Sequence, residues 1–402
     1  MKRIMLITPM LHQGGFERIC VMTARLLQND YEVVIVVFSM EDIAFDISGL
    51  KVINLNLASR KGILGKLVNV FLRCLKLTRL QKNLKTDISY SFGATANIAN
   101  ALSFGAKHKI TACHSFEEIK EGFYMKLIGR HSDKVLCCSK KMTELTEKTY
   151  GFANVQTLWN PCDIAEILKQ SGHTQGEDLT FFQTEDRVLV SMGREDDVKG
   201  FWHLLKAFRK INEVNPHTRL AIIGEGRFEE YQRLAEKLGI REQVYFTGLK
   251  TNPFPYLRAA DCYLLTSLSE GLPNALVEAL ALSLPIVSVN CLSGPAEILN
   301  RDWKLAEGKE GIYKADFGIL TSRLSEKKDL TVRWKDESKR EILLEEEERL
   351  LAEAVLELFQ DKALYENYQN AALKRAADFS KEAYFEGLVS CIHTLQRLET
   401  VN

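Results

Sequence analysis

The chain of 402 residues is 46% hydrophobic and 26% charged, a balance typical of soluble globular proteins that excludes a disordered chain. No apolar run in it reaches transmembrane length, and 402 residues exceed one ordinary hydrophobic core, so two domains are expected. The net charge is zero, but residues 1–160 hold 22 Lys and Arg against 13 Asp and Glu, a net charge of +9, which leaves −9 for the remainder. This asymmetry predicts different binding partners for the two parts of the chain.

The nine cysteines are scattered along the chain without a Cys-x-x-Cys pair. This spacing favours buried, reduced thiols in a cytoplasmic protein over a disulfide framework or a zinc site. Residues 1–7 begin like a secretion signal, but no apolar core or cleavage site follows them. We therefore expect the protein in the cytoplasm.

In chain order, the first elements predicted are a strand at Arg3–Thr8, a helix at Phe16–Gln28 and a strand at Glu32–Phe38. Short runs of apolar and β-branched residues predict further strands at Ile88–Ser91, Lys109–Cys113 and Lys134–Cys138. A second series of strands is predicted at Arg187–Met192, Arg219–Ile223, Gln243–Phe246, Cys262–Thr266 and Pro285–Val289. Nearly continuous apolar strands separated by helices indicate parallel sheets covered on both faces.

These elements predict two consecutive α/β domains with a ligand cleft between them, at the carboxyl ends of the strands. The first domain is expected over residues 1–160, a polar linker over 161–185, and the second domain over 186–379. A charged segment at 323–349 is expected on the surface, and helices that separate near residues 378–380 are expected beyond it. The last helix, about residues 380–402, is expected to pack back on the first domain.

Two carboxylates stand eight residues apart in the stretch 269–285. Gly271, Pro273 and Asn274 predict a turn into an apolar helix, which places Glu270 on the entry loop and Glu278 about one turn inside the helix. Because helical side chains lean toward the N-terminus, both acids can face one space beside N–H groups that attract phosphate. Such a site favours a ligand that joins phosphates to several hydroxyls, namely a nucleotide-sugar. For Glu278 alone, interaction with the helix dipole is an equally good explanation.

Two cations, Arg194 and Lys199, follow the first strand of the second domain in a loop expected to point into the cleft. A diphosphate leaving group gains negative charge as a glycosidic bond breaks, and fixed cations stabilise that charge most in the transition state. Each residue alone could be a solvated loop charge. Together with the two glutamates, they favour a binding site.

The segment 59–85 contains eight Lys and Arg and no acidic residue, interleaved with apolar residues. A basic amphipathic helix of this kind can lie in an anionic membrane interface, with contacts expected from Arg73, Lys76, Arg79 and Lys82. An ordinary surface helix with snorkelling basic side chains is the alternative. Nucleic acid is not expected as a partner, because no nucleic-acid motif accompanies the segment.

Several ordered motifs resemble those of family 4 glycosyltransferases with the GT-B architecture, and the resemblance covers nearly the whole chain. The motifs are Gly14-Gly-Phe-Glu-Arg18, Gly193-Arg194 with Lys199-Gly200, Ile222-Ile-Gly-Glu-Gly226, Val244-Tyr-Phe-Thr-Gly248, the Glu270/Glu278 pair and Cys291-Leu-Ser-Gly294-Pro-Ala-Glu297. The resemblance implies two Rossmann-like, doubly wound domains facing a central cleft. The first would bind the acceptor and the second the nucleotide-sugar donor. One departure is Ser283, where many members carry a glycine.

The resemblance also implies roles for individual residues. Arg194 and Lys199 would bind the donor diphosphate, Glu278 the ribose hydroxyls and Glu270 the transferred sugar. His114, which follows the strand Lys109–Cys113, would orient a sugar hydroxyl, although a lone histidine is more often structural. The expected catalytic residues are therefore Glu270, His114, Arg194 and Lys199. The expected donor-binding residues are Gly14, Gly15, Arg194, Lys199, Gly248, Leu249, Asn274, Ala275, Leu276 and Glu278.

No Asp-x-Asp motif occurs, and the acidic run Glu195-Asp196-Asp197 is expected to cap or solvate its loop. Because cations are already available for the diphosphate, we expect a metal-independent enzyme without a cofactor. The leading hypothesis is a retaining hexosyltransferase that moves a hexose or N-acetylhexosamine from a UDP-sugar to a lipid-linked or oligosaccharide acceptor. Surface polysaccharide, capsule or lipopolysaccharide assembly at the cytoplasmic face of the inner membrane is the expected setting. The alternatives are a soluble small-molecule acceptor and a non-catalytic partner subunit that binds sugar-nucleotides.

Overall fold

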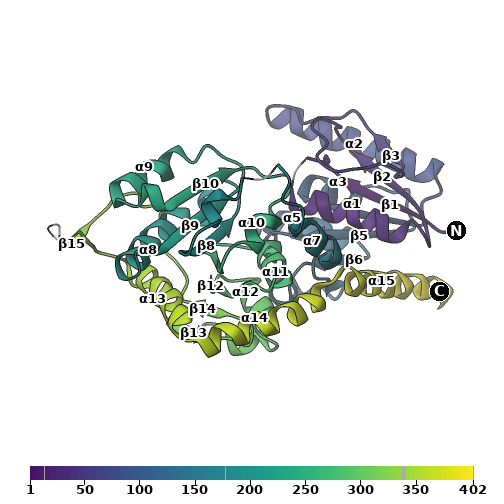
Figure 1. Ribbon diagram of the computed structural model, residues 1–402. Coiled ribbons are helices and arrows are strands. Elements are labelled where there is room, and N and C mark those ends of the chain that lie inside the picture. The colour runs from purple at the N-terminus through teal and green to yellow at the C-terminus, as the bar shows by residue number, and fades with distance from the viewer. Residues whose placement is uncertain (13, 177, 337, 339, 402) are drawn as a thin grey trace. The chain divides into compact units, whose positions relative to one another are not determined.

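The computed structural model describes residues 1–12, 14–176, 178–336, 338 and 340–401 (Figure 1). The chain divides into two compact units: unit 1 comprises Met1–Pro161 with Lys381–Asn402, and unit 2 comprises Cys162–Ser380. Residues 161–185, expected as a linker, contain helix α7 (Ile164–Ser171) and the 3-10 turn η1 (Thr180–Phe182), and from Cys162 onward they belong to unit 2.

Unit 1 is built on a parallel sheet with the strand order β3-β2-β1-β4-β5-β6-β7 in the described residues. Its strands are β1 (Arg3–Thr8), β2 (Glu32–Val37), β3 (Val52–Asn54), β4 (Ile88–Phe92), β5 (His108–Cys113), β6 (Lys134–Cys137) and β7 (Val155–Thr157). Its helices are α1 (Gly15–Leu27), α2 (Ile63–Asn83), α3 (Ala94–Ala101), α4 (Phe116–Lys120), α5 (Gly122–His131), α6 (Lys140–Tyr150) and α15 (Lys381–Val401).

Alternate residues of β1 enter two different core clusters. Ile4 and Leu6 pack with residues of α1 and α15, whereas Met5 and Ile7 pack with residues of α2 and α3. Successive side chains of a strand point to opposite faces of the sheet, so helices cover both faces. The nearly continuous apolar sequence of β1 follows from this double burial.

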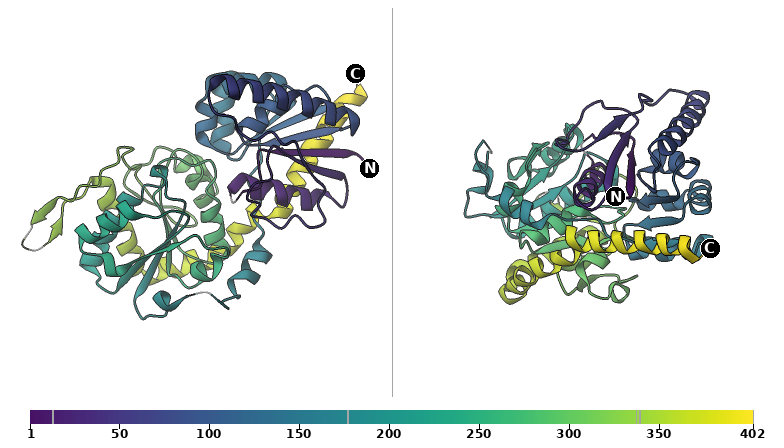
Figure 2. Two further views of the ribbon diagram at one scale, coloured as in Figure 1. Left: turned by 90° about the horizontal axis from the view of Figure 1, so that it is seen from above. Right: turned by 90° about the vertical axis from the view of Figure 1, so that its right-hand side faces the viewer.

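Helix α15 supplies part of the core of unit 1, although it lies more than 200 residues beyond the last strand of that sheet in sequence. Leu388, Ile392 and Leu395 are buried in the same cluster as Ile4. The hydroxyl of Tyr384 lies 2.8 Å from that of Thr23 on α1. Figure 2 shows α15, in yellow, running beside the strands of unit 1.

Unit 2 is built on a sheet with the order β10-β9-β8-β11-β12-β14-β13 in the described residues, and only β13 runs antiparallel to its neighbour. The strands are β8 (Arg187–Met192), β9 (Thr218–Ile223), β10 (Val244–Gly248), β11 (Cys262–Leu265), β12 (Ile286–Val289), β13 (Ile312–Lys314) and β14 (Ile319–Thr321). The further helices are α8 (Phe201–Val214), α9 (Glu229–Leu238), α10 (Phe254–Arg258), α11 (Asn274–Ala281), α12 (Pro295–Leu299), α13 (Glu346–Gln360) and α14 (Lys362–Ala376). Strands β15 (Trp334–Asp336) and β16 (Glu341–Ile342) form a hairpin that projects from unit 2 (Figure 1).

The expected fold class of two doubly wound α/β units is confirmed. The predicted strands all form, with boundaries shifted by at most two residues, and the helices beyond residue 345 separate at residues 377–380 as expected. The nine cysteines all lie in described residues, none of them forms a disulfide there, and all are buried except the half-buried Cys74. Ser283 adopts a left-handed conformation with φ of 58°, so this serine accepts the backbone strain that a glycine there would avoid.

Helix α2 buries polar side chains and exposes apolar ones. Its buried residues are Asn69, Arg73, Leu77 and Gln81. Arg73 donates from Nε and Nη2 to the Leu57 carbonyl, at 3.1 and 2.7 Å, and its guanidinium lies 4.2 Å from the centre of the Phe38 ring. The expectation that Arg73 contacts a membrane is therefore wrong, because its hydrogen bonds hold it inside unit 1.

The opposite side of α2 is unusually apolar for a surface. Ile63, Leu64, Leu67 and Phe71 are 81%, 75%, 62% and 62% exposed. Lys76 also lies on the surface but donates to the Leu55 carbonyl at 2.9 Å, whereas Arg79 and Lys82 are exposed. No helix within the described residues is both long enough and apolar enough to cross a bilayer.

The ends of β8 and β9 approach so closely that glycine is required between them. A Cβ at Gly224 would lie 1.8 Å from the Gly193 carbonyl oxygen, and the Gly193 amide already donates to Ile223 at 2.9 Å. Gly224→Ala should lower the free energy of unfolding by about 2–3 kcal/mol, because the backbone must move to admit the methyl group. Chemical denaturation measures this loss.

Gly172→Ala is the matched control in unit 2, since the nearest atom to its added Cβ lies 3.5 Å away. Its backbone has φ of −84°, which alanine adopts freely. Equal stabilities of the two variants would contradict the steric argument.

Candidate active site

The site in unit 2 lies at the carboxyl edge of its sheet, where the loops after β8 and β11 meet. Lys199 Nζ is 2.7 Å from Glu270 Oε1, and the two side chains are 23% and 14% exposed. β8 and β11 are neighbours in the sheet, so residues 71 positions apart in sequence are brought into one ion pair. The sequence placed both residues in one site, and the structure brings them into direct contact.

The loop that carries Lys199, residues 194–200 (the cationic loop), is fixed by the end of β11. The hydroxyl of Thr266 donates to the Lys199 carbonyl at 2.9 Å, and the Leu268 amide donates to the Val198 carbonyl at 2.8 Å. Gly200 has φ of 61°, and a Cβ there would lie 2.4 Å from the Thr266 carbonyl oxygen. A side chain at Gly200 is excluded on both grounds.

The acidic residues of the cationic loop have structural partners. Glu195 Oε2 accepts hydrogen bonds from the amides of Arg227 and Phe228, at 2.8 and 2.9 Å, just before α9. Asp196 caps the 3-10 turn η2 (Asp197–Lys199) by accepting from the Val198 amide at 3.0 Å. These two contacts agree with the expectation that the acidic run caps its loop. Arg194 is exposed on the same loop.

Glu278 is the fifth residue of α11 and is 4% exposed. Both it and Glu270 act on Tyr263, whose pKa is raised mainly by burial and further by the negative charges of these two carboxylates. The two acids therefore share one region of unit 2, as expected from their spacing. The Tyr263 hydroxyl in turn contacts the backbone of Met192 at the end of β8, where it accepts from the amide at 3.2 Å.

The N-terminus of α11 is built on a turn held by the loop after β12. Ser293 Oγ donates to the Gly271 carbonyl at 2.8 Å, and a Cβ at Gly294 would lie 2.3 Å from Pro273 Cδ. The helix begins with Asn274, Ala275 and Leu276. The Leu276 amide donates to the Pro273 carbonyl at 3.0 Å, so this expected phosphate contact has a partner within its own turn.

Gly248 is the last residue of β10 and Leu249 follows it, at the carboxyl edge of the unit 2 sheet. Gly248 has φ of 69°, its carbonyl accepts from the Gly224 amide at 3.2 Å, and Leu249 is 51% exposed. The structure thus places the expected donor-binding residues of unit 2 on loops, on a strand end or in the first turns of α11, at the carboxyl edge of the sheet.

In unit 1, Gly14 and Gly15 stand at the start of α1, after β1. A Cβ at Gly14 would lie 2.1 Å from the carboxylate of Glu17, which folds back over the N-terminus of its own helix. Glu17 is 7% exposed. A side chain at Gly14 would therefore displace the Glu17 carboxylate, and the helix N-terminus directs its dipole toward the carboxyl edge of this sheet.

His114 follows β5 and is held by Asn160, whose Oδ1 lies 3.1 Å from His114 Nδ1. The imidazole stacks on Phe92 with ring centres 6.0 Å apart. Burial lowers the pKa of His114 to about 4, against the opposing effect of the hydrogen bond to Asn160. The ring is therefore neutral at pH 7. Its buried Nε2 has no hydrogen-bond partner among the described residues and, with Nδ1 as the donor, is an acceptor.

Sequence reasoning missed three residues of the unit 2 site. Thr266 and Tyr263 act through hydrogen bonds to the backbone of β8 and its loop, for which no motif exists. Arg323 lies close enough for its charge, with that of Lys199, to act on Cys291, whose pKa is nevertheless raised to about 12 by burial and by Glu270. Arg323 Nε donates to the Asn290 carbonyl at 3.2 Å. Its place in the charged segment 323–349 was the one available signal.

The chain is similar to known glycosyltransferases. Residues 178–305 match the family model of the group 1 glycosyl transferases. An uncharacterised glycosyltransferase of Methanocaldococcus jannaschii is 28% identical over 331 residues, covering 77% of this chain and 80% of that protein. The N-acetylgalactosamine-N,N'-diacetylbacillosaminyl-diphospho-undecaprenol 4-alpha-N-acetylgalactosaminyltransferase of Campylobacter jejuni is 24% identical over 389 residues, covering 92% and 94%.

Among solved structures, that of Anabaena HepE in complex with UDP-glucose matches with a TM-score of 0.75 at 18% identity, covering 98% of this chain and 100% of that one. This likeness establishes the GT-B fold. The family match over residues 178–305 and the named relatives establish the class of protein: the chain is a glycosyltransferase. The expected resemblance to glycosyltransferases and the expected enzyme class are confirmed.

The lowered pKa of His114 predicts a pH dependence of stability. Its folded pKa of about 4 lies below the unfolded value of about 6.5, so the unfolded chain binds the proton first. Stability attributable to this residue is complete above pH 6.5 and is lost as pH falls toward 4. His114→Gln should therefore flatten the fall in unfolding free energy between pH 6.5 and 4, measured by denaturation at each pH. A variant with the same acid sensitivity as the parent protein would contradict a buried, neutral His114.

Proposed function

We propose that this glycosyltransferase moves a hexose or N-acetylhexosamine from a UDP-sugar to a lipid-linked glycan, with retention of configuration, in surface polysaccharide assembly. The observation that carries the donor assignment is the Lys199–Glu270 ion pair beside Glu278. It supplies a cation and two carboxylates at the N-terminus of α11, within the segment that matches the family. The presence of UDP-glucose in the HepE complex supports UDP as the nucleotide.

The chemistry follows from what each group can donate or accept. The Lys199 ammonium has three N–H donors, of which one is used by Glu270, so two can face diphosphate oxygens. As the bond between the sugar C1 and the diphosphate oxygen breaks, Lys199 and Arg194 stabilise the negative charge that develops on the leaving group. The acceptor oxygen forms the new bond to C1 on the same face, and its proton passes to the departing phosphate oxygen. Glu270 and Glu278 accept hydrogen bonds from sugar and ribose hydroxyls.

His114 has a different duty in this scheme. A neutral imidazole with a buried acceptor nitrogen can accept a hydrogen bond from a sugar hydroxyl. A pKa of about 4 makes it a poor general base near neutral pH. This favours orientation of the sugar over proton abstraction, which is consistent with a retaining reaction that needs no such base.

Metal independence belongs to the same proposal. Glu195 and Asp196 are committed to backbone amides, and Asp197 forms an ion pair with Lys328 at 2.7 Å. The acidic run near the diphosphate position therefore has structural duties, and the cations Lys199 and Arg194 can replace a metal in neutralising phosphate. Activity that survives chelation by EDTA is the expected result.

Glu270→Ala and Lys199→Ala should each abolish sugar transfer, with a loss of at least about a hundredfold in kcat/KM, as expected when one group that stabilises developing charge is removed. Both residues sit on loops rather than in the core, so the melting temperature should stay close to that of the parent protein. Transfer and hydrolysis are measured with a panel of UDP-, GDP- and ADP-sugars.

Lys250→Ala is a control on a neighbouring loop, since Lys250 follows Leu249 and lies against the Tyr256 ring. It should keep the activity of the parent protein. Activity retained by both site variants would refute the donor-site assignment, and thermal protection by a GDP- or ADP-sugar alone would refute UDP.

We further propose that the acceptor is carried on a lipid and that α2 brings unit 1 to an anionic membrane surface. The Campylobacter relative is named for a diphospho-undecaprenol acceptor, and residues 1–160 of this chain carry a net charge of +9. Ile63, Leu67 and Phe71 repeat every fourth residue, so they form one exposed apolar stripe. Full burial of such side chains contributes about 1.5–3 kcal/mol each, and each nearby Lys or Arg adds about 1 kcal/mol at an anionic surface.

The polar contacts of α2 explain why its apolar side is available. Asn69 donates to the Ala58 carbonyl at 2.6 Å, and Arg73 holds the Leu57 carbonyl, so the polar side of the helix faces unit 1. The apolar stripe faces outward as a result. Helices that lie in a membrane interface carry this pattern of an outward apolar face beside basic residues.

Replacing Leu64, Leu67 and Phe71 together by Ser should reduce flotation with anionic liposomes at least tenfold, because the lost side chains supply the apolar part of the binding energy. Activity toward a soluble acceptor analogue should remain. Flotation with phosphatidylglycerol vesicles at two salt concentrations measures both the apolar and the electrostatic contributions.

Phe123→Ser is the matched control, since Phe123 is 83% exposed elsewhere on unit 1. This substitution should leave flotation with anionic liposomes unchanged. If the parent protein does not float with anionic liposomes, the lipid-linked acceptor is refuted and a soluble acceptor is favoured.

A further inference from the structure

The segment 325–348 lies between β14 and the first turn of α13, and its described residues 325–336, 338 and 340–348 include several that make polar contacts to α8. His203, Lys206 and Arg209 follow one another on α8 at intervals of three residues, and all face this segment. His203 Nε2 lies 2.9 Å from the Ser325 carbonyl oxygen, and Arg209 Nη2 donates to the Arg340 carbonyl at 2.9 Å. The segment is thus fastened to the helix that directly follows the cationic loop.

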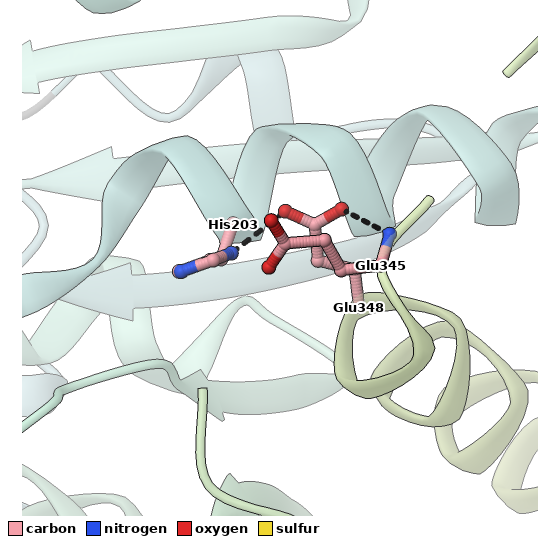
Figure 3. A group of neighbouring side chains, drawn as sticks. All are labelled: His203, Glu345 and Glu348. Atoms are coloured by element: carbon pink, nitrogen blue, oxygen red, sulfur yellow. Dashed lines mark hydrogen bonds and ion pairs between the residues drawn. The ribbon is translucent and has the colours of Figure 1, made fainter. Parts of the chain in front are cut away.

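Figure 3 shows the contacts of His203 on α8 with Glu348 and of Glu348 with Glu345, at the C-terminal end of this segment. His203 Nδ1 lies 2.7 Å from Glu348 Oε1, both side chains are 1% exposed, and Glu348 Oε2 accepts from the Glu345 amide at 3.1 Å. The spacing of these three side chains could suit a metal. However, Lys206 Nζ lies 3.8 Å from Glu348 Oε1, and both ring nitrogens of His203 already face protein oxygens. The group is therefore a hydrogen-bonded clamp between α8 and α13.

Lys328, in the same segment, contacts the cationic loop directly. Its Nζ lies 2.7 Å from Asp197 Oδ1, also pairs with Glu230, and sits 5.4 Å from the centre of the Tyr231 ring. Partial burial opposes its charge, but hydrogen bonds to Asp197 and Glu230 outweigh this effect and raise the pKa of Lys328. The ammonium is therefore charged at all pH values in which the enzyme would work.

Asp197 lies two residues before Lys199, in the same 3-10 turn. Thr266 holds this turn from the side of the sheet, and Lys328 holds it from the opposite element, the segment 325–348. The Lys199 amide donates to the Asp196 carbonyl at 2.9 Å within the turn. The direction of the Lys199 side chain depends on this turn keeping its shape.

We propose that Lys328 is a positioning residue for donor binding, which it supports by holding the cationic loop through Asp197. The charged segment 325–348 is thereby a brace for the donor site. This inference rests on the proposed function of the cationic loop. Lys328 touches neither of the groups assigned to the sugar, so its effect must pass through the shape of the loop.

Lys328→Met should weaken the binding of UDP about fivefold, and it should raise KM for the donor more than it lowers kcat. Hydrogen exchange at the amides of residues 198–200 should accelerate, because the turn opens more often. Lys328→Arg should restore most of the affinity. Asp197→Asn should have a similar effect to Lys328→Met, and the double variant should be no worse than either one, since both remove the same contact.

Lys335→Met is the matched control on the same segment, since Lys335 pairs with Glu341 at 2.9 Å within the β15–β16 hairpin. It should leave UDP binding and loop exchange unchanged. Unchanged exchange and unchanged UDP affinity in Lys328→Met would overturn the inference. If the parent protein binds no nucleotide diphosphate, the proposed function fails instead, and the exchange rates of residues 198–200 still decide whether Lys328 positions the loop.

Discussion

The contact between Lys199 and Glu270 is the interaction on which the proposed donor site of unit 2 depends. It exists because β8 and β11 are adjacent in the sheet and their loops leave the same edge. Thr266 fixes the carbonyl of Lys199, and the left-handed Gly200 turns the chain into α8 without room for a side chain. A cation and a carboxylate held in this way keep their positions when a ligand arrives, so little reorganisation is needed to stabilise charge.

Both units place their candidate functional groups at the carboxyl ends of parallel strands, but the groups differ between the units. Each presents glycine-containing turns and polar side chains at the carboxyl ends of parallel strands. Unit 2 places charged groups there, whereas unit 1 offers a neutral histidine and a glycine-lined helix start. Unit 1 also carries the positive charge and the exposed apolar stripe of α2. This division is consistent with the proposal that unit 2 binds the donor through charged groups and that unit 1 takes its acceptor from a lipid surface.

The sequence was sufficient for the central strands and for the glutamate pair, because apolar runs and turn residues are local signals. It failed for β3 and β7, whose three-residue lengths leave no pattern, and for β13 to β16. Arg73 was misjudged because charge spacing cannot reveal that a guanidinium bonds the Leu57 carbonyl. The contact between Lys328 and Asp197 could not be predicted from the sequence either, because the two residues are 131 positions apart. Long-range polar contacts of this kind carry no periodicity.

The inclusion of α15 in unit 1 has a consequence for synthesis of the chain. Tyr384, Leu388, Cys391, Ile392 and Leu395 complete a core whose other buried members lie in the first 136 residues. During translation those strands leave the ribosome long before α15 exists, while all of unit 2 is made in between. Unit 2 can therefore finish folding first, while one face of the β1 sheet is covered by α1 but not yet by α15. Exposed apolar strands are prone to aggregation, so a nascent chain stalled before residue 381 is a natural client for chaperones.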